Sequence, residues 1–193
     1  MADFNKAFNE TIIPNEGKYS NDKNDNGGET VYGLTRKDDV DWEGWKIVDN
    51  YKGKSGYPNN LPYSQLLLLA QSYYKKKYWD YAQMDYAQMD KFPSQDLAKK
   101  IFSISVNMGK SIAIMFLQRA LNVLNHNGKD YPNITIDGIF GTQTLSNVLK
   151  CNVTNVLDVV KSLQGARYVA LSESNSKLQD FTNGWINRMR DEG

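Results

Sequence analysis

The stretch Asn15-Glu-Gly-Lys-Tyr-Ser-Asn-Asp-Lys-Asn-Asp-Asn-Gly-Gly-Glu-Thr-Val-Tyr-Gly-Leu-Thr35 places one glutamate between an amphipathic segment and a polar, glycine-rich turn. Apolar residues recur at helical spacing before this stretch, so we expect a helix to deliver Glu16 to the surface. Pro14 and Gly17 are predicted to end that helix around the glutamate. The stretch has the composition of an active site.

The second half of the same stretch predicts a hairpin. The corner Asn26-Gly27-Gly28 is typical of a tight turn between strands, and residues 30–35 alternate as a returning strand would. The predicted hairpin therefore brings Asp25 and Thr30 back toward Glu16.

Two carboxyl groups that face each other across a cleft suit the hydrolysis of a glycosidic bond. One must be protonated to protonate the leaving oxygen, while the other is ionised to activate water or stabilise the oxocarbenium-like transition state. Glu16, near Tyr19 and Tyr32 in sequence, is the better candidate for the protonated acid. Asp25 lies in a loop rich in Asn and is the better candidate for the ionised partner.

Further motifs lie beyond this stretch, and together with those inside it they resemble a known family. They are Glu-Gly-x-Tyr (16–19), Asp-x-x-Asp-x-Gly-Gly-x-Thr-x-Tyr-Gly-Leu-Thr (22–35), Tyr-Trp-Asp (78–80), Val-Asn-x-Gly (106–109), Phe-Leu-Gln-Arg-Ala-Leu (116–121), Asp-Gly-x-x-Gly-x-x-Thr (137–144) and Phe-x-x-Gly-Trp-x-x-Arg (181–188). In this order, over nearly the whole chain, they resemble glycoside hydrolase family 108. That family comprises bacterial and phage N-acetylmuramidases of lysozyme-like fold, some once named secretion activators.

The resemblance implies catalytic roles for three residues. Glu16 matches the family's catalytic acid. The spacing of Glu16, Asp25 and Thr30 also resembles that of the Glu, Asp and Thr of phage-type lysozymes, whose second and third residues hold the attacking water. Asp22 is the alternative to Asp25, since a glycine-rich loop can turn either side chain inward.

Five residues are expected to contact the substrate: Tyr19, Asp22, Tyr32, Thr35 and Asn107. Tyr32 fits a cross-strand packing residue equally well. Asn107 fits a buried helix cap equally well.

Two positions depart from the family pattern. Lys18 replaces the usual second glycine and is expected to change substrate contacts. Ser103 stands where an aspartate often precedes the Val-Asn-x-Gly motif, which leaves any helper role of that position in doubt.

The predicted fold is mainly α (α+β), a lysozyme-like helical body with a small β-hairpin at the active site and a C-terminal helical subdomain. We assign residues 1–125 to the catalytic region and residues 126–193 to the C-terminal region packed on the same body. Helix starts are predicted at a Thr35-to-Asp38 capping box, Pro62, Ser94, Ser111, Thr142 and Thr154. Residues 134–145 resemble the signature of small peptidoglycan-binding modules and serve either wall binding or scaffolding.

Composition excludes several classes of function. With 23 basic and 22 acidic residues, the chain has no charge excess to attract a nucleic acid. One cysteine and one histidine exclude the multi-histidine zinc centres of cell-wall amidases. A thiol-protease pair of Cys151 and His126 is formally possible but has no supporting motif. We expect no cofactor and no metal.

The first residues lack a basic region followed by an apolar core, and no apolar run is long enough to span a bilayer. We therefore expect synthesis in a bacterial cytoplasm without a membrane anchor, and action on the wall after release. A phage endolysin is released to the wall in this way, and the resemblance implies the same for this chain. The expected partner is peptidoglycan, and the expected state is a monomer.

Three alternatives stay open at this point. Asp22, Asn24, Asn26 and Gly27 fill positions of a calcium-binding loop, but Gly33 stands where the bidentate glutamate belongs. The chain also fits a non-catalytic wall-binding or secretion-promoting protein. A lytic transglycosylase needs only one acid and would have no need of Asp25 and Thr30.

Overall fold

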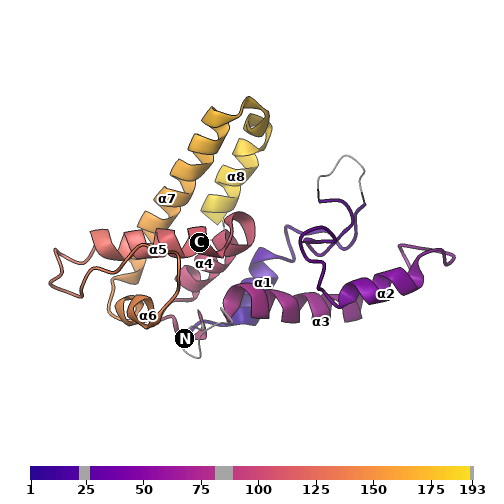
Figure 1. Cartoon of the computed structure of the whole chain (residues 1–193), viewed down its shortest axis with the longest axis horizontal. Coiled ribbons are helices and arrows are strands. Elements are labelled where there is room, and N and C mark those ends of the chain that lie inside the picture. Colours follow the sequence, from indigo (N-terminus) through magenta and orange to yellow (C-terminus); the bar gives the residue numbers. More distant parts are fainter. Residues whose placement is uncertain (22–26, 81–88, 192–193) are drawn as a thin grey trace. The chain divides into compact units, whose positions relative to one another are not determined.

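The computed structural model describes residues 1–21, 27–80 and 89–191. Two compact units emerge, one of residues 8–77 and one of residues 1–7 with 78–193. Helices dominate both, and the strands among the described residues form a single two-stranded antiparallel hairpin (Figure 1). The predicted mainly α fold with a small hairpin is confirmed.

The unit of residues 8–77 is built on two helices and the hairpin. Its elements are the end of α1 (Phe4–Thr11), β1 (Thr30–Val31), β2 (Leu34–Thr35), α2 (Gly44–Tyr51), α3 (Tyr63–Tyr74) and most of a π-helical turn (Lys75–Trp79). Helix α3 buries Leu66, Ala70 and Tyr74, which are spaced four residues apart and so share one face. The predicted start of this helix after Pro62 is confirmed.

The predicted position of the hairpin turn needs correction. Residues 30–35 do not form one returning strand, because Thr30 pairs with Thr35 and Val31 pairs with Leu34. Tyr32 and Gly33 form the two-residue turn, with φ of 49° and 78°. Two successive positive φ angles suit the right-handed twist of the flanking strands.

A second pairing closes the longer loop before the hairpin. Ser20 and Thr30 form an antiparallel bridge, with hydrogen bonds of 2.9 and 2.8 Å between their backbones. The loop between them contains the predicted corner Asn26-Gly27-Gly28, of which Asn26 lies outside the described residues. The bridge returns Thr30 to the segment that follows Glu16, as expected.

Only half of the predicted capping box at Thr35 forms, and it does not open a helix. The Asp38 backbone N–H donates to Thr35 Oγ1 at 3.1 Å, yet α2 begins only at Gly44. Asp39 explains the interruption. Its buried carboxylate accepts hydrogen bonds from the Thr35 N–H and from Lys77, so the chain turns here around a side chain.

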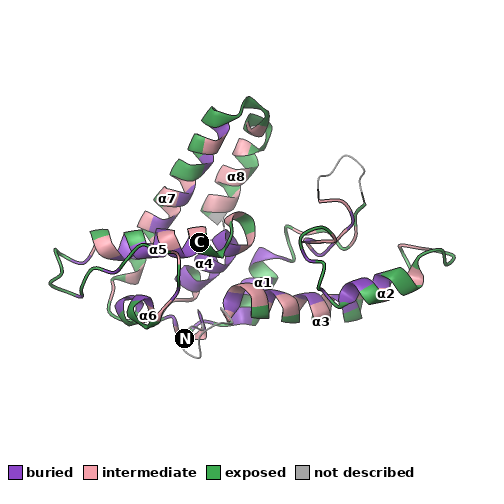
Figure 2. Cartoon of the chain, viewed as in Figure 1, coloured by how far each residue is buried: buried purple, intermediate pink, exposed green. Residues whose placement is uncertain are grey.

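The core of the other unit is formed by α4 (Gln95–Met108), α5 (Lys110–Val123) and α7 (Val153–Ser174). Helix α4 is the most completely buried of them, and every residue from Leu97 to Ser105 is buried. Buried residues also cover much of its ribbon in Figure 2. Ser94 caps it as predicted, since its side chain accepts from the Leu97 N–H. The predicted cap at Ser111 is wrong, because Gly109 adopts a φ of 94° and α5 begins directly after it.

The remaining elements of this unit are α6 (Thr142–Val148), a 3-10 turn (Ser176–Leu178) and α8 (Gln179–Asp191), which lies beside α7 (Figure 1). Helices α6 and α7 begin within one residue of their predicted starts, with Gly141 and Asn152 as N-caps. The turn at Asp137 and Gly138 is held by buried Gln118, whose side chain accepts from both backbone N–H groups and donates to the Asp137 carboxylate.

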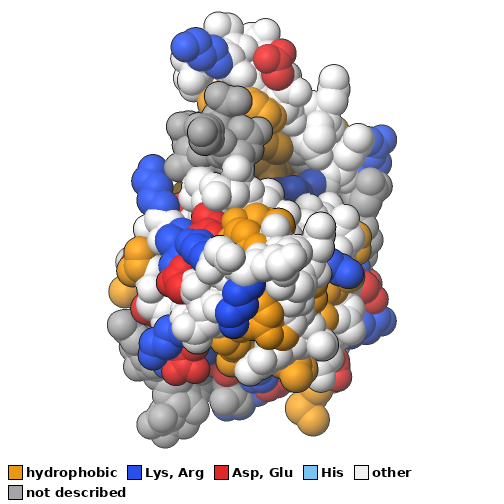
Figure 3. Space-filling view, turned by 90° about the vertical axis from the view of Figure 1, so that its right-hand side faces the viewer, with side chains coloured by type: hydrophobic (Ala, Val, Ile, Leu, Met, Phe, Trp, Pro, Cys, Tyr) orange, Lys and Arg blue, Asp and Glu red, His pale blue; other side chains and the backbone are white. Residues whose placement is uncertain are grey.

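The surface mixes charges of both signs. On the face drawn in Figure 3, Lys and Arg side chains lie beside Asp and Glu side chains, with hydrophobic side chains between them. A single-sign basic face of the kind that binds nucleic acid is not formed there. No helix in the described ranges 1–21, 27–80 and 89–191 has the length and apolar character needed to cross a bilayer.

The cap of α4 makes a testable contribution to stability. Ser94→Ala removes the acceptor that holds the Leu97 N–H at 3.3 Å and is expected to lower the free energy of unfolding by about 1 kcal/mol. Urea denaturation measures this change. Ser111→Ala is the matched control, because Ser111 is exposed in the first turn of α5 and caps nothing. Equal losses in the two variants would contradict the assignment of the cap.

Candidate active site

Glu16 sits in a turn that extends beyond α1. The predicted helix end around Glu16 is wrong, because α1 ends at Thr11, before Pro14. The Glu16 backbone N–H still donates to the Ile12 carbonyl at 2.9 Å. The next residue is tied to the hairpin, because the Tyr32 N–H donates to the Gly17 carbonyl at 3.0 Å. The segment that carries Glu16 is therefore fixed at both ends, and the side chain is half-buried.

The Glu16 side chain packs directly against Gly33 of the hairpin turn. A Cβ at position 33 would lie 2.8 Å from both Cγ and Cδ of Glu16 and 2.7 Å from the Tyr74 hydroxyl. Glycine is required at position 33 for two reasons. A side chain would crowd Glu16 and Tyr74, and the φ of 78° disfavours any residue with a side chain. The bare Cα of Gly33 thus makes room for the glutamate and for the phenol together.

Tyr74 supplies the buried wall beside the glutamate. Its ring meets Phe8 of α1 edge to face at 5.6 Å, and its hydroxyl donates to the Tyr32 carbonyl at 3.1 Å. Both rings are buried. Helices α1 and α3 and the hairpin turn therefore converge behind Glu16. Sequence reasoning did not single out Tyr74 for this role.

Thr30 lies at the centre of the small sheet. It pairs with Ser20 on one side and with Thr35 on the other, and its Oγ1 donates to the Gly28 carbonyl at 3.0 Å. The structure therefore places Thr30 in the hairpin whose turn contacts Glu16. Asp25 and Asp22, the two candidates for the second carboxylate, lie outside the described residues, so their roles stay predictions.

The other predicted substrate contacts fall into two groups. Tyr32 is buried and its hydroxyl donates to the Tyr63 carbonyl at 3.2 Å, which fits the packing role. Thr35 is half-buried and exchanges hydrogen bonds with Asp38. Asn107 belongs to the unit of residues 78–193, where its side-chain carbonyl accepts from Arg188 and its amide donates to the Ser103 carbonyl. Substrate contact by these residues stays a prediction.

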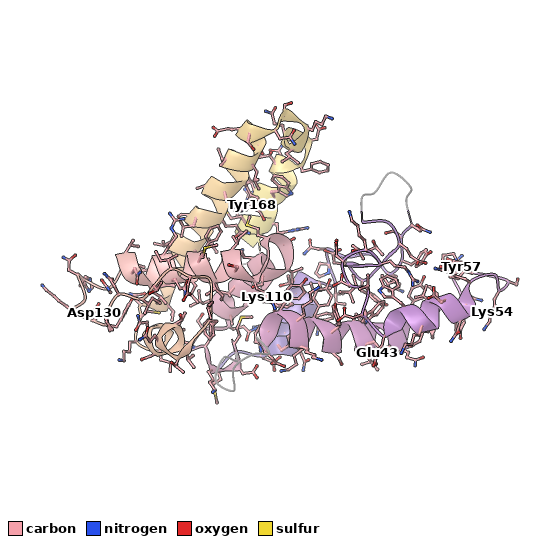
Figure 4. All side chains as sticks on the ribbon, in the orientation of Figure 1. Glu43, Lys54, Tyr57, Lys110, Asp130 and Tyr168 are labelled. Carbon is pink, nitrogen blue, oxygen red and sulfur yellow. The ribbon has the colours of Figure 1, made fainter. Side chains whose placement is uncertain are left out.

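Glu29 is the residue that sequence reasoning missed. Its carboxylate is 8% exposed and accepts hydrogen bonds from four side chains. These donors are Arg36 at 2.6 Å, Lys52 at 3.0 Å, Tyr57 at 3.0 Å and Tyr19 at 3.1 Å. Tyr57 follows α2 in the loop that also contains Lys54 (Figure 4). Tyr19 was expected to touch substrate, but its hydroxyl is bound by Glu29 and Tyr57.

The environment of Glu29 keeps it ionised. Burial by itself would raise the pKa of this carboxyl, but the hydrogen bonds from Lys52 and Tyr57, the charge of Arg36 and the hydrogen bond from Tyr19 outweigh burial and lower the pKa below its ordinary value of 4.5. Arg36 is itself held by Asp49 through two hydrogen bonds of 3.1 and 2.7 Å. The sequence contains one indication that Glu29 is buried. Glu29 and buried Val31 are two residues apart, and residues two apart in a strand face the same side.

The described residues were also expected to hold no metal site, and Cys151 was a formal candidate for thiol chemistry. Among residues 1–21, 27–80 and 89–191, no three His, Cys, Asp or Glu side chains lie together as a metal site requires. The calcium-loop residues Asp22, Asn24 and Asn26 lie outside these ranges. Burial raises the pKa of the Cys151 thiol to about 11, so this thiol is protonated at neutral pH and is a poor nucleophile.

Comparison with protein families decides which kind of protein carries this site. The model described as "Glycosyl hydrolase 108" matches residues 9–109, more than half of the chain. The chain belongs to glycosyl hydrolase family 108. A second model, described as "Predicted Peptidoglycan domain", matches residues 112–190. The match to family 108 contains Glu16, Glu29, Gly33 and Tyr74. The assignment of residues 1–125 and 126–193 to two regions stays a prediction.

One solved structure similar to this family 108 chain is that of Brucella abortus SagA. The two share 22% sequence identity with a TM-score of 0.64, over 98% of this chain and 91% of the SagA chain. The likeness shows that the fold is shared. No curated protein matches the chain.

The contact between Gly33 and Glu16 can be tested through stability. Gly33→Ala adds a methyl group within 2.8 Å of Glu16 and Tyr74 atoms and is expected to lower the free energy of unfolding by about 2–4 kcal/mol. Gly53→Ala is the matched control, since its φ of 80° is nearly the same and its Cβ meets no atom within 4 Å. Thermal or urea unfolding of both variants measures the difference. Similar losses would show that strain at positive φ, and not crowding, dominates.

The Glu29 network predicts a defined pH dependence. Because the pKa of Glu29 is lower in the folded chain than its ordinary value of 4.5, its contribution to stability is complete above that pH and is lost as pH falls through the folded value. Glu29→Gln is expected to cost about 2–4 kcal/mol near neutral pH, and progressively less below pH 4.5. Urea denaturation across pH measures both effects.

Glu43→Gln serves as the control for charge removal, because Glu43 is exposed and its side chain caps nothing in α2 (Figure 4). It is expected to change stability by less than about 0.5 kcal/mol. A loss in Glu29→Gln that stays constant with pH would argue against the ionised network.

Proposed function

We propose that this family 108 chain is an N-acetylmuramidase, a lysozyme that hydrolyses the β-1,4 bond between N-acetylmuramic acid and N-acetylglucosamine. Glu16 acts as the general acid in this proposal. The observation that carries it is the packing of the Glu16 side chain against Gly33 and beside the Tyr74 hydroxyl. A carboxyl held against a hairpin turn and a buried aromatic residue is partly shielded from water, as a general acid requires.

The proposed reaction assigns a role to each side of the sugar ring. Glu16 delivers its proton to the glycosidic oxygen as the bond to the anomeric carbon breaks. Asp25, or Asp22 in its place, accepts a proton from the attacking water, and Thr30 helps to position that water. Water attack on the opposite face inverts the anomeric carbon, which requires carboxyl groups roughly 6.5–9.5 Å apart. A separation near 5 Å would imply retention instead.

The peptidoglycan substrate is supported by the second family match over residues 112–190. We propose that these residues hold the wall while the unit with Glu16 cleaves it, and that the protein acts as a monomer. The turn at residues 134–145 is one candidate for wall contact. Synthesis in the cytoplasm and release to the wall, as for a phage endolysin, belong to the same proposal.

The decisive experiment is the lysis of purified peptidoglycan by wild type and Glu16→Gln. Glutamine keeps the size of the side chain but has no proton to deliver, so the rate is expected to fall by about 10²–10⁴. Glu43→Gln, an exposed acid of α2, is the control and is expected to retain full activity. Circular dichroism and thermal unfolding establish that all three proteins are equally folded.

Other outcomes would point to other functions. Near-wild-type lysis by Glu16→Gln would remove the glutamate from the chemistry. Wall binding without lysis by the wild type would favour the non-catalytic binder. Mass spectrometry of the products is expected to find reducing muramic ends, and anhydro-muramic ends would identify a lytic transglycosylase instead.

A further inference from the structure

Three aromatic rings form a continuous stack across α7 and α8. The Tyr168 and Trp185 rings lie 5.2 Å apart with an interplanar angle of 23°, and Phe181 continues the row at 6.2 Å and 22° from Trp185. Ring pairs in the core, such as Phe4 with Trp79, meet edge to face instead. Trp185 therefore lies between the other two rings, and Phe181 is the ring at the outer end of the row.

The stack runs from the interior to the solvent. Tyr168, labelled on α7 in Figure 4, is 4% exposed, Trp185 is half-buried, and Phe181 is 58% exposed. Phe181 and Trp185 are four residues apart and share one face of α8. Gly184 lies between them in sequence, and a Cβ there would meet no atom within 4 Å. Position 184 therefore borders open space.

Basic residues follow the rings along the same helix. Arg188 lies one turn beyond Gly184 and Trp185 and donates a hydrogen bond to the side-chain carbonyl of Asn107, and Arg190 is exposed at the end of α8. Peptidoglycan has matching chemistry. Its sugar rings present flat faces of C–H groups, and its lactyl groups and stem peptides carry carboxylates. Aromatic faces followed by guanidinium groups complement both features.

We propose that Phe181 and Trp185 form a glycan-binding platform on α8 that takes the sugar rings of a peptidoglycan strand. Tyr168 supports the platform from below, and the arginine end of the helix attracts the carboxylates of the wall. The inference rests on the proposed function, since it names the part of residues 112–190 that holds the substrate. The Phe-x-x-Gly-Trp-x-x-Arg motif then has a binding role beyond packing.

The full chain carrying Glu16→Gln tests this platform, because the wall then stays intact during the measurement. Binding to purified peptidoglycan is measured by sedimentation for the parent and for Phe181→Leu, Phe181→Tyr and Leu149→Ala. Phe181→Leu keeps an apolar side chain but loses the flat ring, and is expected to weaken binding about tenfold or more. Phe181→Tyr keeps the ring and should bind within about twofold of the parent. Leu149 is equally exposed in the same region, and its variant should bind like the parent.

Tryptophan fluorescence gives a second readout that identifies the site. The chain has four tryptophans, of which Trp42, Trp45 and Trp79 are buried, so Trp185 is the one open to a ligand. Peptide-free glycan fragments of alternating N-acetylglucosamine and N-acetylmuramic acid are expected to change the emission of the parent. Trp185→Phe should abolish that change.

The outcomes separate this inference from the proposed function. Undiminished wall binding by Phe181→Leu, or a fluorescence change that persists in Trp185→Phe, would overturn the platform alone. Binding that requires the stem peptides and ignores peptide-free glycan would overturn it as well. Failure of the parent to bind peptidoglycan at all would overturn both the platform and the wall-holding role of residues 112–190.

Discussion

The carboxylate of Glu29 is the interaction on which the unit of residues 8–77 depends. It gathers donors from the segment after Glu16, from the strand exit at Arg36, from the end of α2 and from the loop that follows α2. These segments are short or irregular, and they lie far apart in the sequence. A buried charge that is fully hydrogen-bonded favours one arrangement of these segments, because the buried carboxylate would lose its donors in any other.

This network has a direct consequence for the candidate acid. The hairpin that begins at Glu29 turns at Tyr32 and Gly33, and that turn packs against Glu16. Glu29 anchors the hairpin at its strand ends, and this anchoring therefore also fixes the turn that packs against Glu16. The proposed chemistry depends on that rigidity, since a general acid must be held within hydrogen-bonding reach of the glycosidic oxygen.

The unit of residues 78–193 is stabilised in a different way. Its helices α4, α5 and α7 bury a continuous apolar core, and Gln118 satisfies the backbone of the Asp137 turn. Helix α8 adds two rings that are partly in solvent, Phe181 and Trp185. The family model matched over residues 112–190 is described as a predicted peptidoglycan domain, and the rings of α8 are the surface that we propose for this binding. Catalysis and wall holding are thus proposed to rest on separate sets of side chains.

The sequence by itself determined the helical class, most helix starts, the family and the position of Glu16 beside a hairpin. The family was indicated by the resemblance of the motifs, and the other features follow from local signals, namely apolar periodicity, caps and turn residues, that neighbouring residues supply. Tertiary structure alone decided that the hairpin turns at Tyr32 and Gly33, and that Asp39 interrupts the helix predicted after Thr35. It also decided that Glu29 is a buried anchor. Its partners, Lys52 and Tyr57 among them, lie far along the chain, and a charge becomes an anchor only when folding brings its donors together.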